Sequence, residues 1–232
     1  MNFKLKILSV LVLLSLNCFA MEIKQEIDPG VQSALASQFY QDLGKEAQFS
    51  VGIPEAQHVP IKNFPNLIKQ LQSFAITSDT DIYIDEYYLD LALYGIQRCI
   101  IFHEAIHRKY NDLQYLKNVT NKALGLKFDS EENLKNYLKI YAEEVQQCRS
   151  FCEHRADTEG LYATQCYMCV NEYLKLQQLS FQEADETKNG ISEKKMNYLG
   201  YATIDEMKKI VDNLMQQNKI CAYHKINGTK LH

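Results

Sequence analysis

The sequence predicts a predominantly α-helical α+β protein in which a small β-hairpin or sheet packs against the helix that carries His103-Glu104-x-x-His107. Two short stretches rich in β-branched and aromatic residues, 73–77 and 81–85, are typical of strands. From Glu86 onward the chain has no proline and few glycines, which favours long helices. All four prolines lie in the first third of the chain, where we expect short helices joined by loops.

The expected elements follow from local patterns along the chain. The two strands are separated by Ser78-Asp-Thr80, which predicts a hairpin or two short strands. Asp129 or Ser130 is a suitable N-cap for the third helix, and Thr203 is one for the last helix. A polar loop is expected at 182–190. The expected helices cover residues 31–43, 89–110, 162–179 and 204–217. A further helix is expected to begin at 131, to run through 141 and to continue toward 160.

Length and charge restrict the class of protein. The chain has 232 residues, of which 46% are hydrophobic, which suits one globular domain with a sizeable core. A formal net charge of −4 supplies no electrostatic reason to bind nucleic acid or an anionic membrane surface. We therefore expect no nucleic-acid partner.

Residues 1–20 have the pattern of a secretory signal peptide. Lys4 and Lys6 precede a short apolar run, Ile7 to Leu16, and Ala20 offers a small residue at the cleavage position. Ten apolar residues are too few to span a bilayer, and no later stretch is long enough either. We expect an exported protein, periplasmic or extracellular, without a membrane span. Residues 21–72 would form a structural or removable N-terminal segment, with the structural role favoured, and residues 73–232 would form the main domain.

Six cysteines follow the expected signal peptide. An even number in an exported chain predicts up to three disulfides, which six cysteines can form in fifteen pairings. A less favoured alternative is a second, structural zinc site made by Cys148-x3-Cys152 and Cys166-x2-Cys169. Cys99, one turn before a candidate metal ligand, is expected to be packed or disulfide-bonded rather than redox-active. Cys221 is expected to tether the tail, 218–232. The disulfide candidates are Cys99, Cys148, Cys152, Cys166, Cys169 and Cys221.

The motif His103-Glu104-x-x-His107 lies within the expected helix 89–110. Residues four apart share a helix face, so both imidazoles can reach one zinc ion. They also continue an apolar stripe formed by Leu89, Leu93, Ile96 and Ile100, so they should be buried and need partners. Three fixed residues match by chance in about one chain in a hundred of this length, so two ordinary core histidines are the alternative.

A third ligand is available on the next long helix. Glu153 and Asp157 are four residues apart and share a face, so Glu153 could reach the metal while Asp157 accepts the free N–H of a ligand histidine. Two solvated acids are the alternative. The flanking Cys152, Ala156 and Gly160 favour a packed helix over a solvated one.

His-Glu-x-x-His followed by Glu-x-x-Ala-Asp resembles the M48 zinc metallopeptidases, a group with soluble exported members. Residues 73–89, 95–107 and 153–161 resemble the edge strand and hairpin, the active-site helix and the third-ligand helix of that family. The chain departs from the family at Ser73, where Asn is usual, at 77–79, where Pro-Gly-Gly is usual, and in lacking a downstream His-Pro segment.

The resemblance implies a zinc-dependent endopeptidase with one catalytic Zn²⁺, in a zinc metallopeptidase-like domain that covers residues 73–232. His103, His107 and Glu153 would hold the metal, with water at the open position, and Glu104 would act as general base. An extended peptide substrate could pair with the strand at 73–76. The candidates for the donor that stabilises the oxyanion are His154, Tyr201, Tyr223 and His224.

Two other functions are possible for such a chain. A catalytically silent relative could keep the fold for binding or chaperone-like work, although the metal-site positions hold competent residues. A nucleic-acid-associated zinc protein of the SprT-like kind also carries His-Glu-x-x-His. The signal peptide and the acidic balance weigh against that third function.

Overall fold

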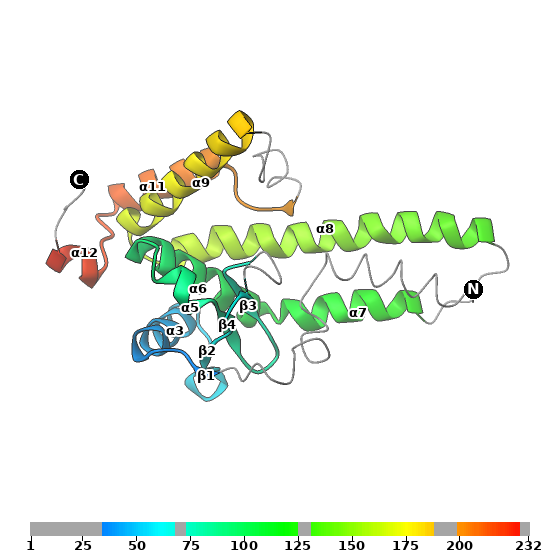
Figure 1. Cartoon of the computed structure of the whole chain (residues 1–232), viewed down its shortest axis with the longest axis horizontal. Helices are drawn as coiled ribbons and strands as arrows, with labels where there is room; N and C mark the ends of the chain where they lie inside the picture. The colour runs from blue at the N-terminus through cyan, green and yellow to red at the C-terminus, as the bar shows by residue number, and fades with distance from the viewer. Residues whose placement is uncertain (1–33, 68–72, 125–130, 188–198, 228–232) are drawn as a thin grey trace.

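A computed structural model of the chain describes residues 34–67, 73–124, 131–187 and 199–227 (Figure 1). Most of these residues are helical, and a small mixed sheet completes the fold, which confirms the predicted α+β class with predominant helix. The expected signal peptide at 1–20 and the expected helix caps Asp129 and Ser130 lie outside the described residues.

The sheet has four short strands in the order β1-β2-β4-β3. The predicted hairpin is present: β3 (Ala75–Thr77) pairs antiparallel with β4 (Ile82–Ile84). Two further strands, β1 (Ala34–Leu35) and β2 (Ile61–Asn63), come from a region in which only helices and loops were expected. β2 runs parallel to β4, so β3 forms one edge of the sheet.

The first described helix is α3 (Gln38–Ser50), which lies later in the chain than the expected helix at 31–43. Tyr40, Leu43 and Ala47 are buried at helical spacing, so the apolar face continues past the point where the prediction ended. After α3 come the 3-10 turn η2 (Glu55–Gln57) and then β2.

The helix that carries the His103-Glu104-x-x-His107 motif begins later than expected. The chain forms α5 (Glu86–Leu89), breaks at 90–93, and then forms α6 (Tyr94–Tyr110), whereas one helix over 89–110 was expected. Leu93 lies in the break and is 58% exposed, so it does not belong to the buried stripe.

α6 is the central element, because hydrophobic clusters cover two of its sides. One cluster joins Ile101, Phe102 and Ile106 to the sheet and α3. The other joins Ile96 and Cys99 to helices from the C-terminal part of the chain. Arg98 adds an ion pair to Glu46 of α3 at 2.7 Å. The position of α6 is therefore set by packing from both sides.

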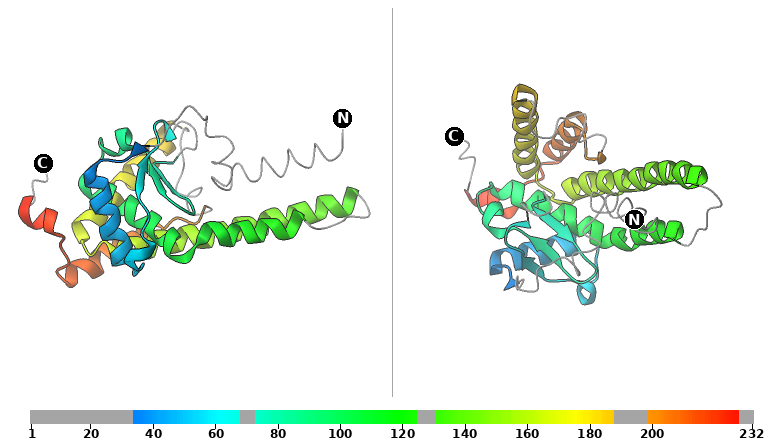
Figure 2. Two further views of the ribbon diagram at one scale, coloured as in Figure 1. Left: turned by 90° about the horizontal axis from the view of Figure 1, so that it is seen from below. Right: turned by 45° about the vertical axis from the view of Figure 1, so that its right-hand side comes forward.

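Two long helices extend from this core. α7 (Asp112–Leu124), which was not expected, leads outward, and α8 (Glu131–Ala163) returns beside it (Figures 1 and 2). The continuous helix from 131 past 160 is confirmed. The C-terminal part of α8 contacts α6.

Three helices complete the chain. α9 (Tyr167–Thr187) starts later than the expected 162–179 and continues into the expected polar loop. α11 (Ile204–Gln216) begins with the predicted cap, because Thr203 and Glu206 form a reciprocal capping box. α12 (Ala222–Asn227) lies in the tail. Among the described helices, none has the length and apolarity that a membrane span requires.

Candidate metal centre

The crossing of α6 and α8 brings the predicted ligands together. Gly160 of α8 lies directly against the backbone of α6, and a Cβ atom built on it would come within 3.0 Å of the His103 nitrogen and 3.1 Å of its Cα. A larger residue would hold the two helices apart. The glycine therefore permits the close approach that places Glu153, two turns earlier on α8, opposite the histidines of α6.

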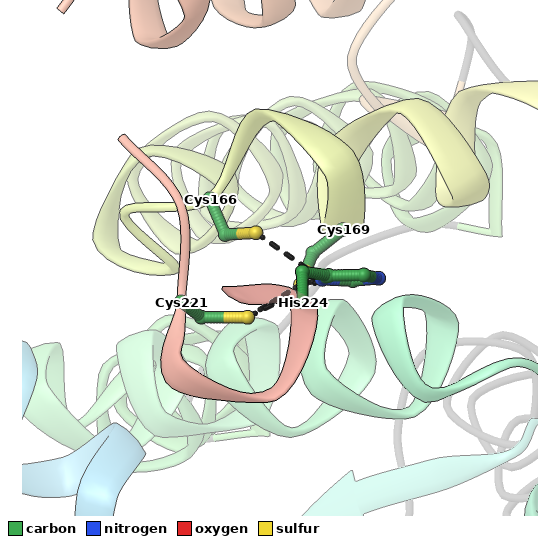
Figure 3. Close-up of side chains that lie close together, drawn as sticks. All are labelled: Cys166, Cys169, Cys221 and His224. Carbon is green, nitrogen blue, oxygen red and sulfur yellow. Dashed lines mark hydrogen bonds between the residues drawn. The ribbon is translucent and has the colours of Figure 1, made fainter. Parts of the chain in front are cut away.

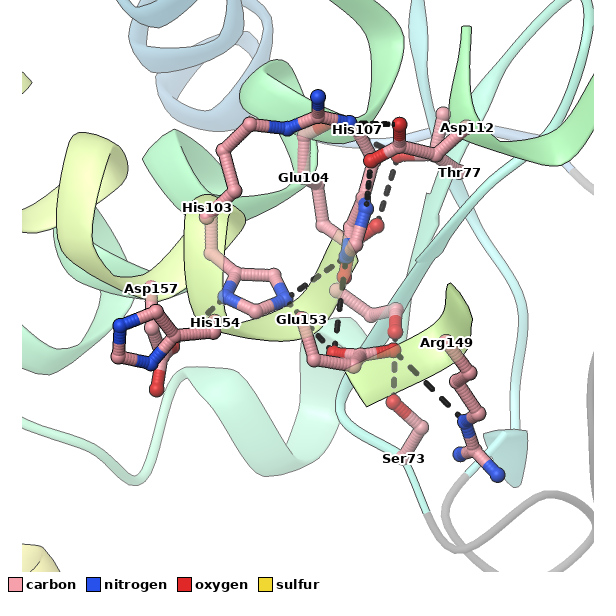
Figure 4. A network of polar contacts seen from close by, with 12 residues as sticks. Ser73, Thr77, His103, Glu104, His107, Asp112, Arg149, Glu153, His154 and Asp157 are labelled. Atoms are coloured by element: carbon pink, nitrogen blue, oxygen red, sulfur yellow. Dashed lines mark hydrogen bonds and ion pairs between the residues drawn. The ribbon is translucent and has the colours of Figure 1, made fainter. Parts of the chain in front are cut away.

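Three ligand atoms converge between the helices (Figure 4). The Nε2 atoms of His103 and His107 are 3.0 Å apart. Oε2 of Glu153 lies 3.4 Å from Nε2 of His103 and 3.6 Å from Nε2 of His107. These three residues, which we call the histidine site, are the set that the motif and the third-ligand helix predicted.

A carboxylate holds the other nitrogen of each imidazole. Asp157 accepts from Nδ1 of His103 at 2.8 Å, and its second oxygen accepts from the Ala202 backbone N–H at 2.9 Å. Asp112 accepts from Nδ1 of His107 at 2.9 Å. The position predicted for Asp157 is therefore present in the structure, whereas the role of Asp112 was not predicted.

A tight helix ending positions Asp112. α6 stops at Asn111, whose φ of 54° and ψ of 43° are left-handed, a conformation that asparagine tolerates better than most residues. The chain therefore turns sharply, and Asp112 at the start of α7 points back at His107. Arg155 of α8 also contacts its carboxylate, which neutralises a nearly fully buried charge.

The chemistry of the site fits a cation. With both Nδ1–H groups donating to aspartates, each Nε2 carries a lone pair, and both lone pairs face each other and the Glu153 carboxylate. Three electron-rich atoms at these distances need a shared positive charge, supplied by a metal ion or by protons. Two nitrogens and one carboxylate oxygen are a ligand set that zinc accepts.

The pKa shifts of the metal-free site also favour a positive charge between these residues. Burial alone would lower the pKa of His107, but hydrogen bonds to Asp112 and Glu153 raise this pKa to about 9. Burial opposes ionisation of Glu153, yet hydrogen bonds from the two histidines hold its pKa well below the usual range. Asp157 and Glu153 likewise overcome burial and raise the pKa of His103.

Glu104 lies beside the histidine site and is 7% exposed. The hydroxyl of Thr77, at the end of β3, lies 2.7 Å from Oε2 of Glu104 and 3.0 Å from its backbone oxygen. The edge strand and the candidate general base are thus joined by one side chain. Thr77 stands where the resembled family usually has proline, and the sequence pattern did not indicate this contact.

Two polar side chains border the site. The ring of Tyr201 lies parallel to that of His103, with 6.1 Å between ring centroids. The negative charge of Glu153 and burial both raise the pKa of Tyr201 well above its ordinary value. Nε of Arg149 is 4.0 Å from Oε1 of Glu153. Of the four oxyanion-donor candidates, Tyr201 stacks on the imidazole of His103. Arg149 is a further candidate that the sequence did not indicate.

The other three donor candidates have other partners. Nε2 of His154 pairs with Glu206 at 3.6 Å, and its side chain is 46% exposed. Tyr223 stacks on Tyr94 of the first turn of α6, and His224 is buried among cysteines. For Tyr223 and His224, spacing along the chain could not show that the tail docks near the N-terminal end of α6, away from the histidine site.

The six cysteines expected to form disulfides, all of which lie in the described part of the chain, are unbonded thiols. Cys99 is packed in the core, as favoured, without a disulfide partner. Cys148 lies near the hydroxyl of Tyr115, with 3.5 Å between Sγ and the oxygen. Cys166, Cys169 and Cys221 gather around His224, so the alternative zinc site has partners different from those considered.

Comparisons with protein-family models, with curated proteins and with solved structures found no match for this chain.

Proposed function

We propose that this protein is an exported zinc endopeptidase that hydrolyses peptide bonds in protein or peptide substrates. The observation that carries the proposal is the convergence of His103, His107 and Glu153, with each imidazole held by a buried aspartate. Three protein ligands leave a fourth zinc position open, which is typical of catalytic rather than structural zinc. Export rests on the signal-like residues 1–20.

Glu104 is suited to move a proton. When bound, zinc would polarise the peptide carbonyl and lower the pKa of a coordinated water from about 15.7 toward about 7. The Thr77 hydroxyl donates a hydrogen bond to Oε2 of Glu104. This contact fixes the carboxylate and leaves Oε1 to take the proton of the attacking water. Glu104 would then pass that proton to the leaving nitrogen.

Tyr201 and Arg149 are the candidates to stabilise the developing oxyanion. A tyrosine hydroxyl is protonated at neutral pH and can donate, and the raised pKa of Tyr201 keeps it a donor at higher pH as well. Arg149 adds a permanent positive charge close to Glu153. Neither contact needs the downstream His-Pro segment that the chain lacks.

The edge strand supports an extended peptide as substrate. β3 pairs with β4 on one side only within the described sheet, and its other edge can form backbone hydrogen bonds with an added strand. Thr77 ends that strand at Glu104, so a peptide paired with β3 would pass the general base. Such backbone recognition predicts loose side-chain preference and favours unfolded proteins as substrates.

The test is hydrolysis of an unfolded protein, followed by mass spectrometry of the new termini. We expect cleavage by wild type, loss of cleavage after chelation, and recovery on adding zinc. His107→Ala should be inactive at every zinc concentration. His58→Ala is the matched control, because the His58 ring hydrogen-bonds to the Ile53 carbonyl and is not part of the histidine site, and it should cleave normally. Zinc binding without cleavage would favour the silent binding protein, and cleavage that survives chelation would contradict the proposal.

A further inference from the structure

A second group of metal-ligating side chains lies outside the histidine site. Cys166 and Cys169 stand at the start of α9, Cys221 directly precedes α12, and His224 lies within it (Figure 3). We call these four residues the cysteine cluster. The sequence pattern is Cys-x2-Cys followed by Cys-x2-His, the short paired spacing that structural zinc sites use.

Four of the distances in the cysteine cluster match those of a tetrahedral zinc site. Zn–S bonds of about 2.3 Å and a Zn–N bond of about 2.0 Å require about 3.8 Å between two sulfurs and about 3.5 Å between a sulfur and the nitrogen. Nδ1 of His224 lies 3.4, 3.6 and 3.3 Å from the sulfurs of Cys166, Cys169 and Cys221. The sulfurs of Cys169 and Cys221 are 3.8 Å apart.

The tautomer of His224 also fits a metal. Its Nε2 lies 3.1 Å from Oε1 of Glu172, so Nε2–H donates to that carboxylate and Nδ1 presents its lone pair to the three sulfurs. A carboxylate behind a ligand histidine is the same arrangement that Asp157 and Asp112 provide in the histidine site. A disulfide would use only two sulfurs, at about 2.05 Å, and would leave this convergence unexplained.

Burial makes the unbound state unfavourable. Cys166 and Cys169 are fully buried, and His224 is 6% exposed. Three thiols aimed at one imidazole nitrogen can supply it with only one hydrogen bond. A cation that takes all four lone pairs satisfies the whole group.

From these observations we propose that Cys166, Cys169, Cys221 and His224 bind a second zinc ion with a structural role. Four protein ligands close the coordination sphere, so no position remains for water or substrate. This site is separate from the proposed catalytic site and does not depend on peptidase activity.

The cysteine cluster joins the tail to the helix that carries the catalytic motif. Glu172, which holds His224, also accepts a hydrogen bond from the backbone N–H of Gly95, in the first turn of α6, at 2.8 Å. Tyr223 stacks on Tyr94 with 4.0 Å between ring centroids. Gly95 leaves no room for a side chain, since a Cβ atom would come within 2.6 Å of the Cys169 Cα. Zinc would therefore fix the start of α6, α9 and α12 to one another.

The first test is zinc content. Wild type should hold two zinc ions per chain, and Cys221→Ser with His224→Ala should hold one. The double variant His103→Ala, His107→Ala should also hold one, at the cysteine cluster. Cys148→Ser is the matched control, since Cys148 is a thiol outside both sites, and it should keep both ions. Two ions retained without Cys221 and His224 would overturn the proposal.

The second test leaves the cysteine cluster unchanged and identifies the atoms that bind zinc there. X-ray absorption at the zinc edge of His103→Ala, His107→Ala should show three sulfurs at about 2.3 Å and one nitrogen at about 2.0 Å. A zinc ion without sulfur ligands, or no zinc at all in this variant, would overturn the proposal. So would a non-reduced peptide map that shows Cys169 and Cys221 joined in a disulfide. None of these results uses hydrolysis, so they remain distinct from failure of the peptidase proposal.

Discussion

Asp112 accepts a hydrogen bond from Nδ1 of His107 at 2.9 Å and is almost fully buried, at 1% exposure. It comes from α7, a different helix from the one that carries Glu153 and Asp157. The two ligand histidines are thus oriented by separate elements, His103 from α8 and His107 from the start of α7. Both Nε2 atoms are directed at the same point as a result.

Replacing Asp112 by alanine should weaken zinc binding at the histidine site. The imidazole of His107 would lose the partner that fixes its tautomer and orientation, and such losses typically cost 10- to 100-fold in metal affinity. Competition with a chromogenic chelator measures the effect, in a Cys221→Ser, His224→Ala background that leaves one site to titrate. Asp42→Ala, an exposed change on α3, is the control. Equal affinities for the two variants would contradict the role of Asp112.

Thr77→Val should slow hydrolysis without removing zinc. Valine has nearly the shape of threonine but cannot hydrogen-bond to Glu104, so the general base would lose its fixed orientation. We expect kcat to fall by about 10-fold or more, with zinc content unchanged. Thr77→Ser keeps the hydroxyl and should keep most of the activity. If the serine and valine variants lose activity equally, the hydroxyl is not what matters.

Gly160→Ala should destabilise the protein and loosen the metal site. In an open helix position alanine would add about 1 kcal/mol of stability over glycine. Here the added methyl meets the backbone of His103 at 3.0 Å, so α8 must move away from α6. Overpacking of this kind costs about 1–3 kcal/mol, and Glu153 would retreat from the histidines. Urea unfolding and zinc affinity measure both effects, and a gain in stability would show that the helices are not in close contact there.

The metal-free protein should lose stability as the pH rises from about 6.5 to about 9. The folded pKa of His107, about 9, lies above its unfolded value of 6.5, so its protonated form stabilises the fold. That contribution is fully present below pH 6.5 and is lost as pH rises through 9. It is of the order of 3 kcal/mol.

Urea unfolding of chelator-treated protein across this pH range measures the loss. Chelator-treated His107→Ala is the control, because it lacks the titrating group and should show a flatter dependence. Zinc-loaded wild type should also lack the loss, since the metal replaces the protons. Parallel curves for wild type and the variant without metal would contradict the raised pKa.

The candidate ligands could be predicted because residues at helical spacing lie on one face of a helix. His103 and His107 are one turn apart, and Glu153 and Asp157 share a face, so their contacts need only that two helices cross. The crossing itself was not derivable from spacing. It depends on Gly160, whose missing side chain admits α6, and the prediction used that residue only as a sign of packing.

Contacts made by loops and by the tail could not be predicted in the same way. Asp112 reaches His107 because Asn111 adopts a left-handed conformation, which no periodic pattern indicates. His224 was expected near the active site, yet it lies among cysteines because the tail docks on α9 and on the start of α6. The spacing Cys221-x2-His224 was the available signal for this cluster. The expectation of disulfides, based on export, paired the cysteines with one another and did not include His224.

We propose that Glu104 performs the proton transfer at a zinc site formed by His103, His107 and Glu153. The most direct measurement compares hydrolysis of an unfolded protein by zinc-loaded wild type and Glu104→Gln, with zinc content measured on the same samples. Glu159→Gln, an exposed change on α8, is the matched control. We predict equal zinc in all three, normal cleavage by Glu159→Gln, and a rate for Glu104→Gln lower by about 10²- to 10⁴-fold. Cleavage by Glu104→Gln at the wild-type rate would contradict the account.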